Sequence, residues 1–436
     1  MPILSHTPPS LAEDSLGHAL LTSAELIAEV VGGTTLTDAL ARLWAARPAT
    51  PAGVRGAILD LTYGTLRDYG RQDFILGKLL QKPLPEPLQS LLRVALHRLA
   101  VRPDTAHTVV DQAVSAAATQ LGGKFKGVAN GVLRNALRQA GELAQGADAD
   151  MVAEHRHPPW WIRRLKGQYP QKWRAILAAG NSHPPMALRV NPLRASDDEV
   201  LADFAAAGIA VKRLAPGTLR LEQPIPVSRI PGFAEGCVSV QDAGAQHAAR
   251  HLDLADGQRV LDACAAPGGK SAHILETADV DLTALDADPL RVRRITDNLA
   301  RLGLGADVKA ADCRNLDAWW DGRPFDRILA DVPCSASGVV RRNPDIKWLR
   351  RSDDIPRFAA QQAEILDALW QTLAPGGKML YATCSVFADE NGAQIAAFAA
   401  RHADCRRLPI AGQLDCQYLP CADHDGFFYA LLEKTA

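Results

Sequence analysis

Two cysteines stand directly after strand-like runs in the second half of the chain. Cys334 lies in Asp331-Val332-Pro333-Cys334-Ser335, after the run 325–330, and Cys384 lies in Thr383-Cys384-Ser385, after the run 378–383. A single free cysteine is most often a small buried apolar residue. If the two strands are neighbours in a sheet, however, both thiols and Asp331 face one cleft, an arrangement that suits nucleophilic catalysis.

Such a pair could support substitution at C5 of cytosine, which is itself a poor nucleophile. A thiolate that adds to C6 turns the ring into an enamine with electron density at C5, and a carboxylic acid near N3, a role for which Asp331 is placed, would stabilise the developing charge. After methyl transfer, a base must remove the C5 proton so that the thiol can leave. The cytosine must also leave its stack, so the target is expected in a loop or flipped out of a helix.

A glycine-containing turn joins the expected strand 259–263 to the helix 271–276. It consists of Cys264, Ala265, Ala266, Pro267, Gly268, Gly269 and Lys270. It matches neither the G-x-G-x-x-G fingerprint nor the G-x-x-x-x-G-K-[ST] phosphate loop. Asp286 ends the second strand, where a carboxylate accepts ribose hydroxyls, and Asp312 ends the third, beside the place for an adenine ring. These features favour a nucleoside-bearing ligand without pyrophosphate, such as S-adenosylmethionine, over NAD, with a generic turn as the alternative.

Strand and helix patterns alternate from residue 236 to 436. Strands are expected at 259–263, 282–285, 308–311, 325–330, 378–383 and 427–432, and helices at 271–276, 290–301, 355–372 and 390–401. This alternation predicts a parallel sheet with helices on both faces, and ligands then bind at the carboxyl ends of the strands.

The preceding residues form two further regions. Residues 1–145 show helical spacing of apolar residues, with Gly122 and Gly123 as a helix stop, and predict an all-helical domain. An alanine-rich polar joint follows at 141–150. Residues 155–235 predict a small α+β subdomain with a basic helix at 162–172, strands at 187–191, 217–221 and 237–240, and a helix at 197–207.

Positive charge gathers between His155 and Arg194, where eight basic residues occur and no acidic one. They are Arg156, Arg163, Arg164, Lys166, Lys172, Arg174, Arg189 and Arg194. This block predicts a track for a nucleic-acid backbone, with a solvated basic linker as the alternative. Trp160 and Trp161 could stack on bases, but at least one of them is expected in the core.

Several protein classes are excluded by composition. All eight cysteines follow residue 236 and none forms a C-x-x-C pair, which argues against a disulfide scaffold or a metal site. Cys416, Cys421 and His424 are interpreted as structural. No apolar run is long enough to span a membrane, and residues 1–10 carry no secretory pattern, so a cytoplasmic protein is expected.

Three ordered motifs resemble the RsmB/NOP family of RNA cytosine-C5 methyltransferases. They are residues 262–270, residues 331–335 together with Gly338-Val339-Val340-Arg341-Arg342-Asn343-Pro344-Asp345, and Tyr381-Ala382-Thr383-Cys384-Ser385. Residues 124–134 and the helix around 91–99 also resemble the NusB family of helical RNA-binding domains. That resemblance implies an RNA-binding or ribonucleoprotein-docking module, with a merely bracing bundle as the alternative.

The resemblance implies a multidomain fold with an all-α NusB-like domain, a small α+β linker and a C-terminal α/β class I (Rossmann-like) methyltransferase domain. It implies S-adenosyl-L-methionine as cofactor, held by residues 264–270, Asp286, Asp312 and Asp331. Cys384 becomes the nucleophile and Cys334 assists breakdown of the adduct; this division rests on the resemblance, since DNA cytosine methyltransferases use the Pro-Cys thiol.

The implied substrate is small-subunit rRNA, acted on by a monomer without a metal. The alternatives are tRNA, large-subunit rRNA, or a non-catalytic RNA-binding assembly factor.

Overall fold

The computed structural model describes residues 11–435, so the expectation about residues 1–10 lies outside it. The chain forms two compact units. The first contains residues 11–182 together with Val340–Arg351, and the second contains His183–Val339 and residues 352–435. The sequence placed the first boundary near residue 145, whereas the contacts extend the first unit to Ser182 and add a segment from the C-terminal region.

The first unit is all-helical, as predicted. Its α-helices are α1 (Leu16–Val31), α2 (Leu36–Ala46), α3 (Ala52–Leu79), α4 (Glu86–Val101), α5 (Ala106–Thr119), α6 (Lys126–Arg138), α7 (Ala140–Ala149), α8 (Met151–His155), α9 (Pro159–Gln168), α10 (Trp173–Asn181) and α15 (Ile346–Leu349). The interpretation of residues 141–150 as a polar joint is wrong, because they form α7 and bury Leu143 and Ala147. Two apolar residues four apart are enough to fix that helix on its neighbours.

The core of the helical unit surrounds α4. This helix carries a proline in its first turn and buries apolar side chains on most of its circumference, among them Leu91, Val94 and Leu99. A helix that is buried on most sides lies at the centre of a bundle. Helices α1, α3 and α5 supply the facing apolar residues of the same core.

The segment Val340–Arg351 is anchored in this helical unit by buried polar groups. Lys347 has 0% exposure, and its Nζ donates at 2.8–3.0 Å to the carbonyls of Arg67 and Arg156 and to Oδ1 of Asn181. Asp345 accepts from the backbone N–H of Leu36, the first residue of α2, at 3.0 Å. Because buried donors and acceptors are costly to leave unpaired, these bonds fix the position of the segment.

The second unit begins with a four-stranded antiparallel sheet in the order β2-β3-β1-β4. The strands are β1 (Met186–Val190), β2 (Val211–Ala215), β3 (Thr218–Leu221) and β4 (Val238–Val240), and α11 (Asp197–Ala206) packs on them. Leu188 and Val190 of β1 share a core with Phe204 of α11. The predicted strands and helix are confirmed, and β2 is an additional strand.

A larger sheet follows in the order β10-β12-β9-β8-β5-β6-β7, with β11 paired to β12. Its strands are β5 (Arg259–Ala263), β6 (Asp281–Asp286), β7 (Asp307–Ala310), β8 (Phe325–Asp331), β9 (Leu373–Thr383), β10 (Cys405–Leu408), β11 (Cys416–Tyr418) and β12 (Phe427–Lys434). Strands β5 to β9 are parallel, as predicted. The expectation of a wholly parallel sheet is wrong, because β12 runs antiparallel to β9, and β10 and β11 run antiparallel to β12.

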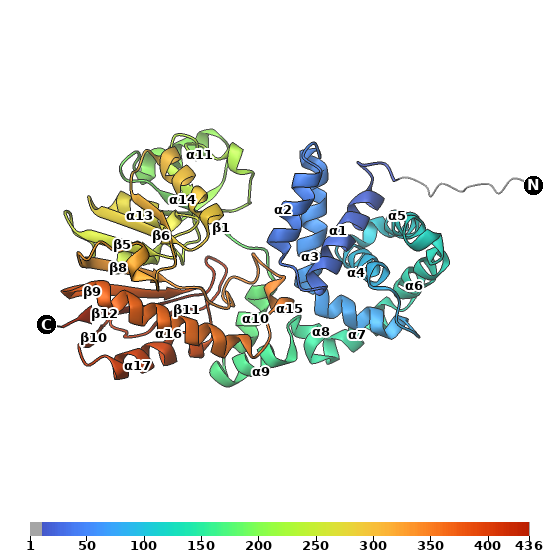
Figure 1. The fold of residues 1–436 in the computed structure, drawn as a ribbon. Helices are drawn as coiled ribbons and strands as arrows, with labels where there is room; N and C mark the ends of the chain where they lie inside the picture. Colours follow the sequence, from blue (N-terminus) through green and yellow to red (C-terminus); the bar gives the residue numbers. More distant parts are fainter. Residues whose placement is uncertain (1–10, 436) are drawn as a thin grey trace, which may run out of the picture. The chain divides into compact units, whose positions relative to one another are not determined.

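Helices cover both faces of the larger sheet (Figure 1). They are α12 (His247–His251), α13 (Gly269–Thr277), α14 (Pro289–Leu302), α16 (Asp354–Thr372) and α17 (Gly392–Arg401). Helices α12 and α13 bury residues such as Ile274 against one face, and α16 and α17 bury residues such as Leu369 and Phe398 against the other. Among residues 11–435, no helix has the length and apolar content that a membrane span requires.

Candidate active site

The two cysteines predicted from the sequence lie together at neighbouring strand ends. Strands β8 and β9 pair in parallel, with Asp331 opposite Ala382. The loops that follow them bring Sγ of Cys334 to 3.4 Å from Sγ of Cys384. Both side chains are partly exposed. The pair therefore combines close contact with access from solvent, which covalent catalysis requires.

The two thiols are not equivalent. The hydrogen bond to Cys384, together with burial, raises the pKa of Cys334 well above its ordinary value. Either thiol can be the donor in the contact between the two sulfurs.

A partly buried ion pair lies beside these thiols. Nζ of Lys270 is 2.5 Å from Oδ2 of Asp331, and Lys270 also interacts electrostatically with Cys384. Burial opposes the charge of Lys270, but the Asp331 carboxylate outweighs it and raises the pKa of the lysine. The lysine of the glycine-containing turn thus places a positive charge close to both Asp331 and Cys384.

A buried glutamate that sequence reasoning missed joins the two cysteine loops. Glu390 accepts from the backbone N–H of Ser335 at 2.7 Å and from its hydroxyl at 2.5 Å. It also accepts from the hydroxyl of Ser385 at 2.6 Å and from Nε2 of Gln362 at 3.2 Å. Burial raises the pKa of Glu390. Each serine directly follows a cysteine, so one carboxyl group fixes both thiols; the repeated Cys-Ser dipeptide was the available signal.

The loop after Cys334 is held by close backbone packing. The Gly338 N–H donates to the carbonyl of Cys384 at 2.8 Å, and the Gly426 N–H donates to the carbonyl of Gly338 at 2.9 Å. A Cβ atom on Gly338 would lie 2.4 Å from the carbonyl oxygen of Gly426. Only glycine fits there, because no side chain can occupy that space.

The glycine-containing turn lies at the same edge of the sheet. Ala263 of β5 is in register with Leu285 of β6 and with Ala330 of β8, so residues 264–270, Asp286 and Asp331 follow adjacent strand ends. Cys264 and Gly268 both have positive φ, at +65° and +92°. Gly268 precedes α13 as its N-cap. Gly268 is buried, and a Cβ atom there would lie 3.0 Å from Cα of Ile295, so the missing side chain lets the turn pack closely on α14.

The carboxylates predicted around the turn differ in their surroundings. Asp286 is buried; it accepts from the Ala266 N–H at 3.1 Å and lies 3.3 Å from Nη1 of Arg291. Asp312 lies past β7 and is held by Arg314 at 2.7 Å, which lowers the pKa of Asp312. Asp286 therefore contacts the backbone of the turn directly, whereas the carboxylate of Asp312 pairs with Arg314.

Asp262, the residue before the end of β5, is completely buried. Its Oδ2 accepts from the hydroxyl of Ser271 at 2.6 Å, while its Oδ1 has no hydrogen-bond partner among the described residues. Burial raises the pKa of Asp262 to about 7. A carboxyl group with this pKa exchanges its proton near neutral pH.

The basic track predicted from the sequence is only partly at the surface. Arg163, Lys166, Lys172 and Arg174 are exposed. Arg156 pairs with Asp68 at 3.0 Å. Arg194 donates to the carbonyls of Glu235 and Leu302, and Arg189 has only 1% exposure. The assignment of Arg189 to an RNA-facing track is wrong, because charge counting does not distinguish a buried arginine from an exposed one.

The tryptophans follow the expectation that at least one belongs to the core. Trp161 has 1% exposure, and Trp160 packs on it with ring centroids 5.2 Å apart. The sequence did not single out Trp173, whose buried ring lies 4.4 Å from the guanidinium carbon of Arg174. An aromatic ring with a cation over it fixes the direction of that basic side chain.

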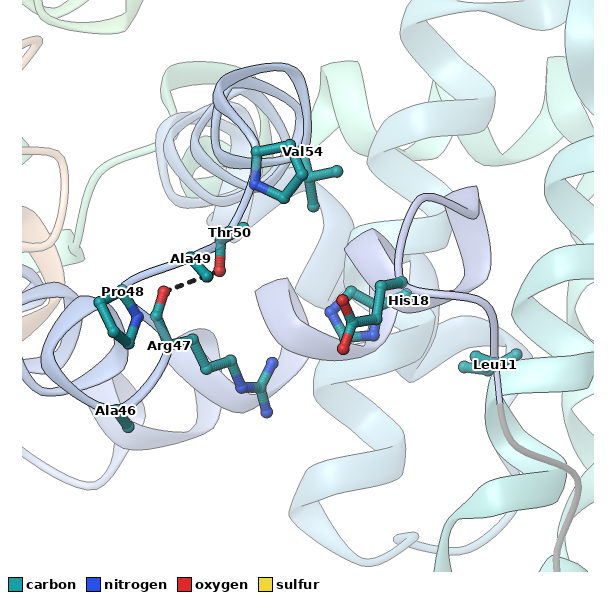
Figure 2. Close-up of a pocket in the computed structure, with 10 residues that line it drawn as sticks. Leu11, His18, Ala46, Arg47, Pro48, Ala49, Thr50 and Val54 are labelled. Atoms are coloured by element: carbon teal, nitrogen blue, oxygen red, sulfur yellow. Dashed lines mark hydrogen bonds between the residues drawn. The ribbon is translucent and has the colours of Figure 1, made fainter.

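The helical unit contains a separate hollow of about 560 Å³ (Figure 2). It is lined by residues of α1 and of the α2–α3 turn, and the Thr50 hydroxyl donates to the Arg47 carbonyl at its edge, at 2.9 Å. None of its ten lining residues is a cysteine. The hollow therefore offers no thiol for covalent catalysis.

The acidic, histidine and cysteine side chains do not gather into a metal centre. Within residues 11–435, no three of them are grouped so as to hold a metal ion. Of the three residues interpreted as structural, Cys416 is buried in β11, Cys421 is exposed, and His424 contacts the carbonyl of Asp425 at 2.7 Å.

Three family models match successive parts of the chain. They are the NusB family over residues 20–138, the RsmF/B-like ferredoxin-like domain over 157–228, and the 16S rRNA methyltransferase RsmB/F over 249–433. The three matches follow the helical bundle, the small sheet and the large sheet in order.

Known proteins resemble the chain over most of its length. Ribosomal RNA small subunit methyltransferase B from Pseudomonas putida is 45% identical, and the match covers 88% of this chain and 91% of that protein. The crystal structure of PH0851 shares the fold over 98% of this chain and 100% of its own, with a TM-score of 0.80 and 24% identity. A methyltransferase homolog protein from Pyrococcus horikoshii is 26% identical, with a TM-score of 0.57 over 65% of this chain and 97% of that chain.

These matches agree with the architecture. The helical bundle, the small sheet and the large sheet occur in the order of the three matched models, and the relatives span nearly the whole chain. The chain therefore belongs to the 16S rRNA methyltransferase RsmB/F family, whose members methylate RNA with S-adenosyl-L-methionine as the methyl donor.

Proposed function

We propose that this enzyme methylates C5 of a cytosine in small-subunit rRNA through a covalent bond between Cys384 and C6. The observation that carries the proposal is the 3.4 Å contact between the Cys384 and Cys334 sulfurs beside the Lys270–Asp331 ion pair. A thiolate, a second thiol and a carboxylate at one sheet edge are the groups that this reaction needs.

The residues at the sheet edge fit the cofactor. Residues 264–270 would hold it: Gly269 presents backbone with no other atom closer than 3.9 Å to the place of a Cβ, and Asp286 offers a carboxylate that accepts from hydroxyls. When bound, S-adenosyl-L-methionine supplies an electrophilic methyl group. Asp331 is expected to face both the cofactor and the pyrimidine, and Asp312 to border the site.

The two cysteines divide the work. Sγ of Cys384 forms the bond to C6, and the electron pair of the C5–C6 double bond shifts towards N3, where the Lys270–Asp331 pair supplies a proton through the Asp331 carboxyl group. After methylation, a base takes the C5 proton, the double bond reforms and the C6–S bond breaks. We propose that the Cys334 S–H assists this last step by donating a hydrogen bond to the departing Cys384 sulfur, which lies 3.4 Å from the Cys334 sulfur in the free protein.

Bisulfite sequencing tests the position and the substrate together. In a strain lacking this gene, one cytosine of small-subunit rRNA should lose its resistance to bisulfite, and the wild-type gene should restore it. A change confined to tRNA or large-subunit rRNA would place the same chemistry on another substrate. Restoration by a Cys384→Ala gene would instead indicate that the thiol is dispensable.

We further propose that the enzyme works in the cytoplasm as a monomer without a metal ion. Light scattering of the purified protein should give the mass of one chain, 46.8 kDa. Twice that mass would contradict the monomer.

A further inference from the structure

Arg189 is a buried arginine on the central strand of the small sheet, and nothing in the proposed reaction accounts for it. Side chains alternate between the two faces of a strand, so Leu188 and Val190 enter the core of the small sheet while Arg189 points the other way. That other face lies against α13. The guanidinium group of Arg189 thus points towards α13, the helix that begins in the turn 264–270.

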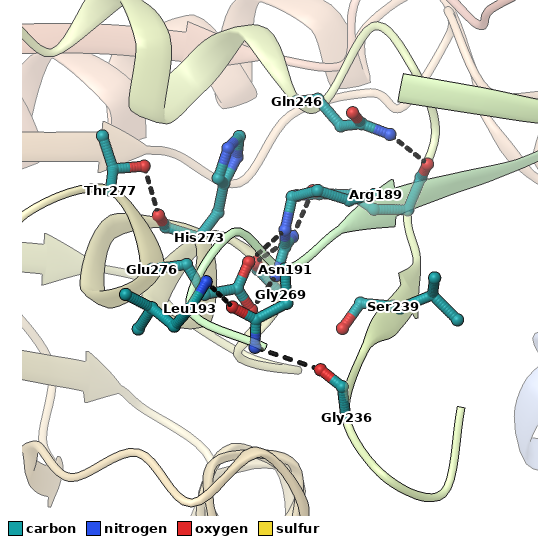
Figure 3. A network of polar contacts seen from close by, with 12 residues as sticks. Arg189, Asn191, Leu193, Gly236, Ser239, Gln246, Gly269, His273, Glu276 and Thr277 are labelled. Atoms are coloured by element: carbon teal, nitrogen blue, oxygen red, sulfur yellow. Dashed lines mark hydrogen bonds and ion pairs between the residues drawn. The ribbon is translucent and has the colours of Figure 1, made fainter. Parts of the chain in front are cut away.

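The contacts of Arg189 are with α13 and its first residue (Figure 3). Its Nε and Nη2 donate to the two carboxylate oxygens of Glu276 at 2.7 and 2.8 Å. Its Nη1 donates to the carbonyl of Gly269 at 3.0 Å and also to Oε1 of Gln241. Two parallel bonds to one carboxylate fix the direction of a guanidinium, and the third nitrogen then reaches the turn itself.

We propose that Arg189 is a positioning residue for the cofactor: from the small sheet it holds the Gly269 carbonyl and Glu276, and so fixes the turn 264–270 in its binding shape. The proposal rests on the proposed cofactor site. It assigns the small sheet a role in cofactor binding besides any contact with RNA.

The geometry explains why an arginine is needed. Gly269 directly precedes Lys270, the partner of Asp331, so a shift of the Gly269 carbonyl also moves that ion pair. Lysine would carry the charge but could not bind Glu276 in two places and Gly269 at once. A pair of apolar residues could fill the volume but would release the carbonyl.

The test separates positioning from folding. Arg189→Met alone leaves the Glu276 charge buried without its partner and can unfold the protein, whereas Arg189→Met with Glu276→Met replaces the pair by apolar groups that are often tolerated. Affinity for S-adenosyl-L-methionine is measured by calorimetry, affinity for a small-subunit rRNA transcript by filter binding, and the unfolding midpoint by heating. Arg213→Met, which removes an exposed pair with Asp198 in the same small sheet, is the matched control.

The double variant should unfold near the wild-type temperature, bind S-adenosyl-L-methionine about tenfold more weakly, and bind the transcript within twofold of the wild type. Wild-type cofactor affinity in a folded double variant would overturn the proposal. So would a loss of transcript affinity with unchanged cofactor affinity, because Arg189 would then act on RNA. Asp286→Ala tests the proposed cofactor site itself. If this variant binds S-adenosyl-L-methionine normally, the proposed site is wrong. If Asp286→Ala loses binding while the double variant keeps it, only the proposed role of Arg189 is wrong.

Discussion

The sulfur atoms of Cys334 and Cys384 lie 3.4 Å apart although 50 residues separate them in the chain. The parallel pairing of β8 with β9 brings the two loops to one place, and the Glu390 carboxyl group holds the serine that follows each cysteine. The reactive pair is thus a product of the sheet and of one buried side chain together.

Loss of the Cys384 sulfur and loss of the Cys334 sulfur should affect different steps of the reaction. Cys384→Ser should lower turnover by about 10³-fold or more, equivalent to about 4 kcal/mol of barrier, because a hydroxyl is a much weaker nucleophile towards C6. Cys334→Ala should still form the bond but release it slowly, since the departing sulfur has lost its hydrogen-bond donor. A denaturing gel of protein incubated with RNA and cofactor should show an adduct for Cys334→Ala and none for Cys384→Ser. The opposite pattern would mean that the two roles are exchanged.

Glu390 should matter for both stability and rate. Glu390→Ala leaves donors of Ser335, Ser385 and Gln362 without their acceptor in a buried place, which should cost about 3 kcal/mol in the free energy of unfolding. Glu390→Gln should cost less but still reduce turnover, because one acceptor oxygen becomes a donor. Urea unfolding and initial rates measure the two effects. Glu364→Gln, an exposed carboxylate paired with Arg314, is the control and should change neither.

Asp262 should make stability depend on pH. Its pKa is about 7 in the folded protein and near 3.8 in the unfolded chain. The folded state therefore keeps this proton while the unfolded state loses it, so the stabilisation is complete below about pH 4 and is lost as pH rises to 7. Compared with Asp262→Asn, the wild type should lose up to about 4 kcal/mol between pH 4 and pH 8, at 1.36 kcal/mol per pKa unit. Urea unfolding curves that fall in parallel for both proteins would refute this.

RNA binding should depend on the exposed basic residues of the first unit and not on Arg194, which is also exposed but donates to carbonyls of the protein itself. Changing Arg163, Lys166, Lys172 or Arg174 to Gln should each reduce the slope of log affinity against log salt by about 0.7 to 0.9 if that residue contacts a phosphate. Arg194→Gln should leave the slope unchanged, because its guanidinium is engaged by the carbonyls of Glu235 and Leu302. Filter binding at several salt concentrations measures these slopes. A slope that changes only with Arg194 would contradict the assignment.

The sequence predicted the parts of the fold that depend on local pattern. The apolar runs 259–263, 325–330 and 378–383 identified the strands. Their ends identified the cysteines, because chemistry at a sheet edge comes from residues that follow strands. The antiparallel direction of β12 was not predictable, since an apolar run carries no direction.

The sequence could not reveal the residues whose role depends on distant partners. Glu390 was expected as the first residue of a helix at 390–401, and nothing in the polar stretch Asp389-Glu390-Asn391 shows that the serines of two other loops surround its carboxyl group. Arg189 was counted with its basic neighbours because burial is a tertiary property. In both cases the deciding contacts span from 5 to 87 residues along the chain.

The segment Val340–Arg351 begins six positions after Cys334, yet it packs in the helical unit with Lys347 buried at its centre. A shortened chain that starts at residue 183 would expose that ammonium group and the apolar surface around it, and would free the end of a reactive loop. Gene fragments divided at this point should give poorly soluble products, so both units must be expressed as a single polypeptide.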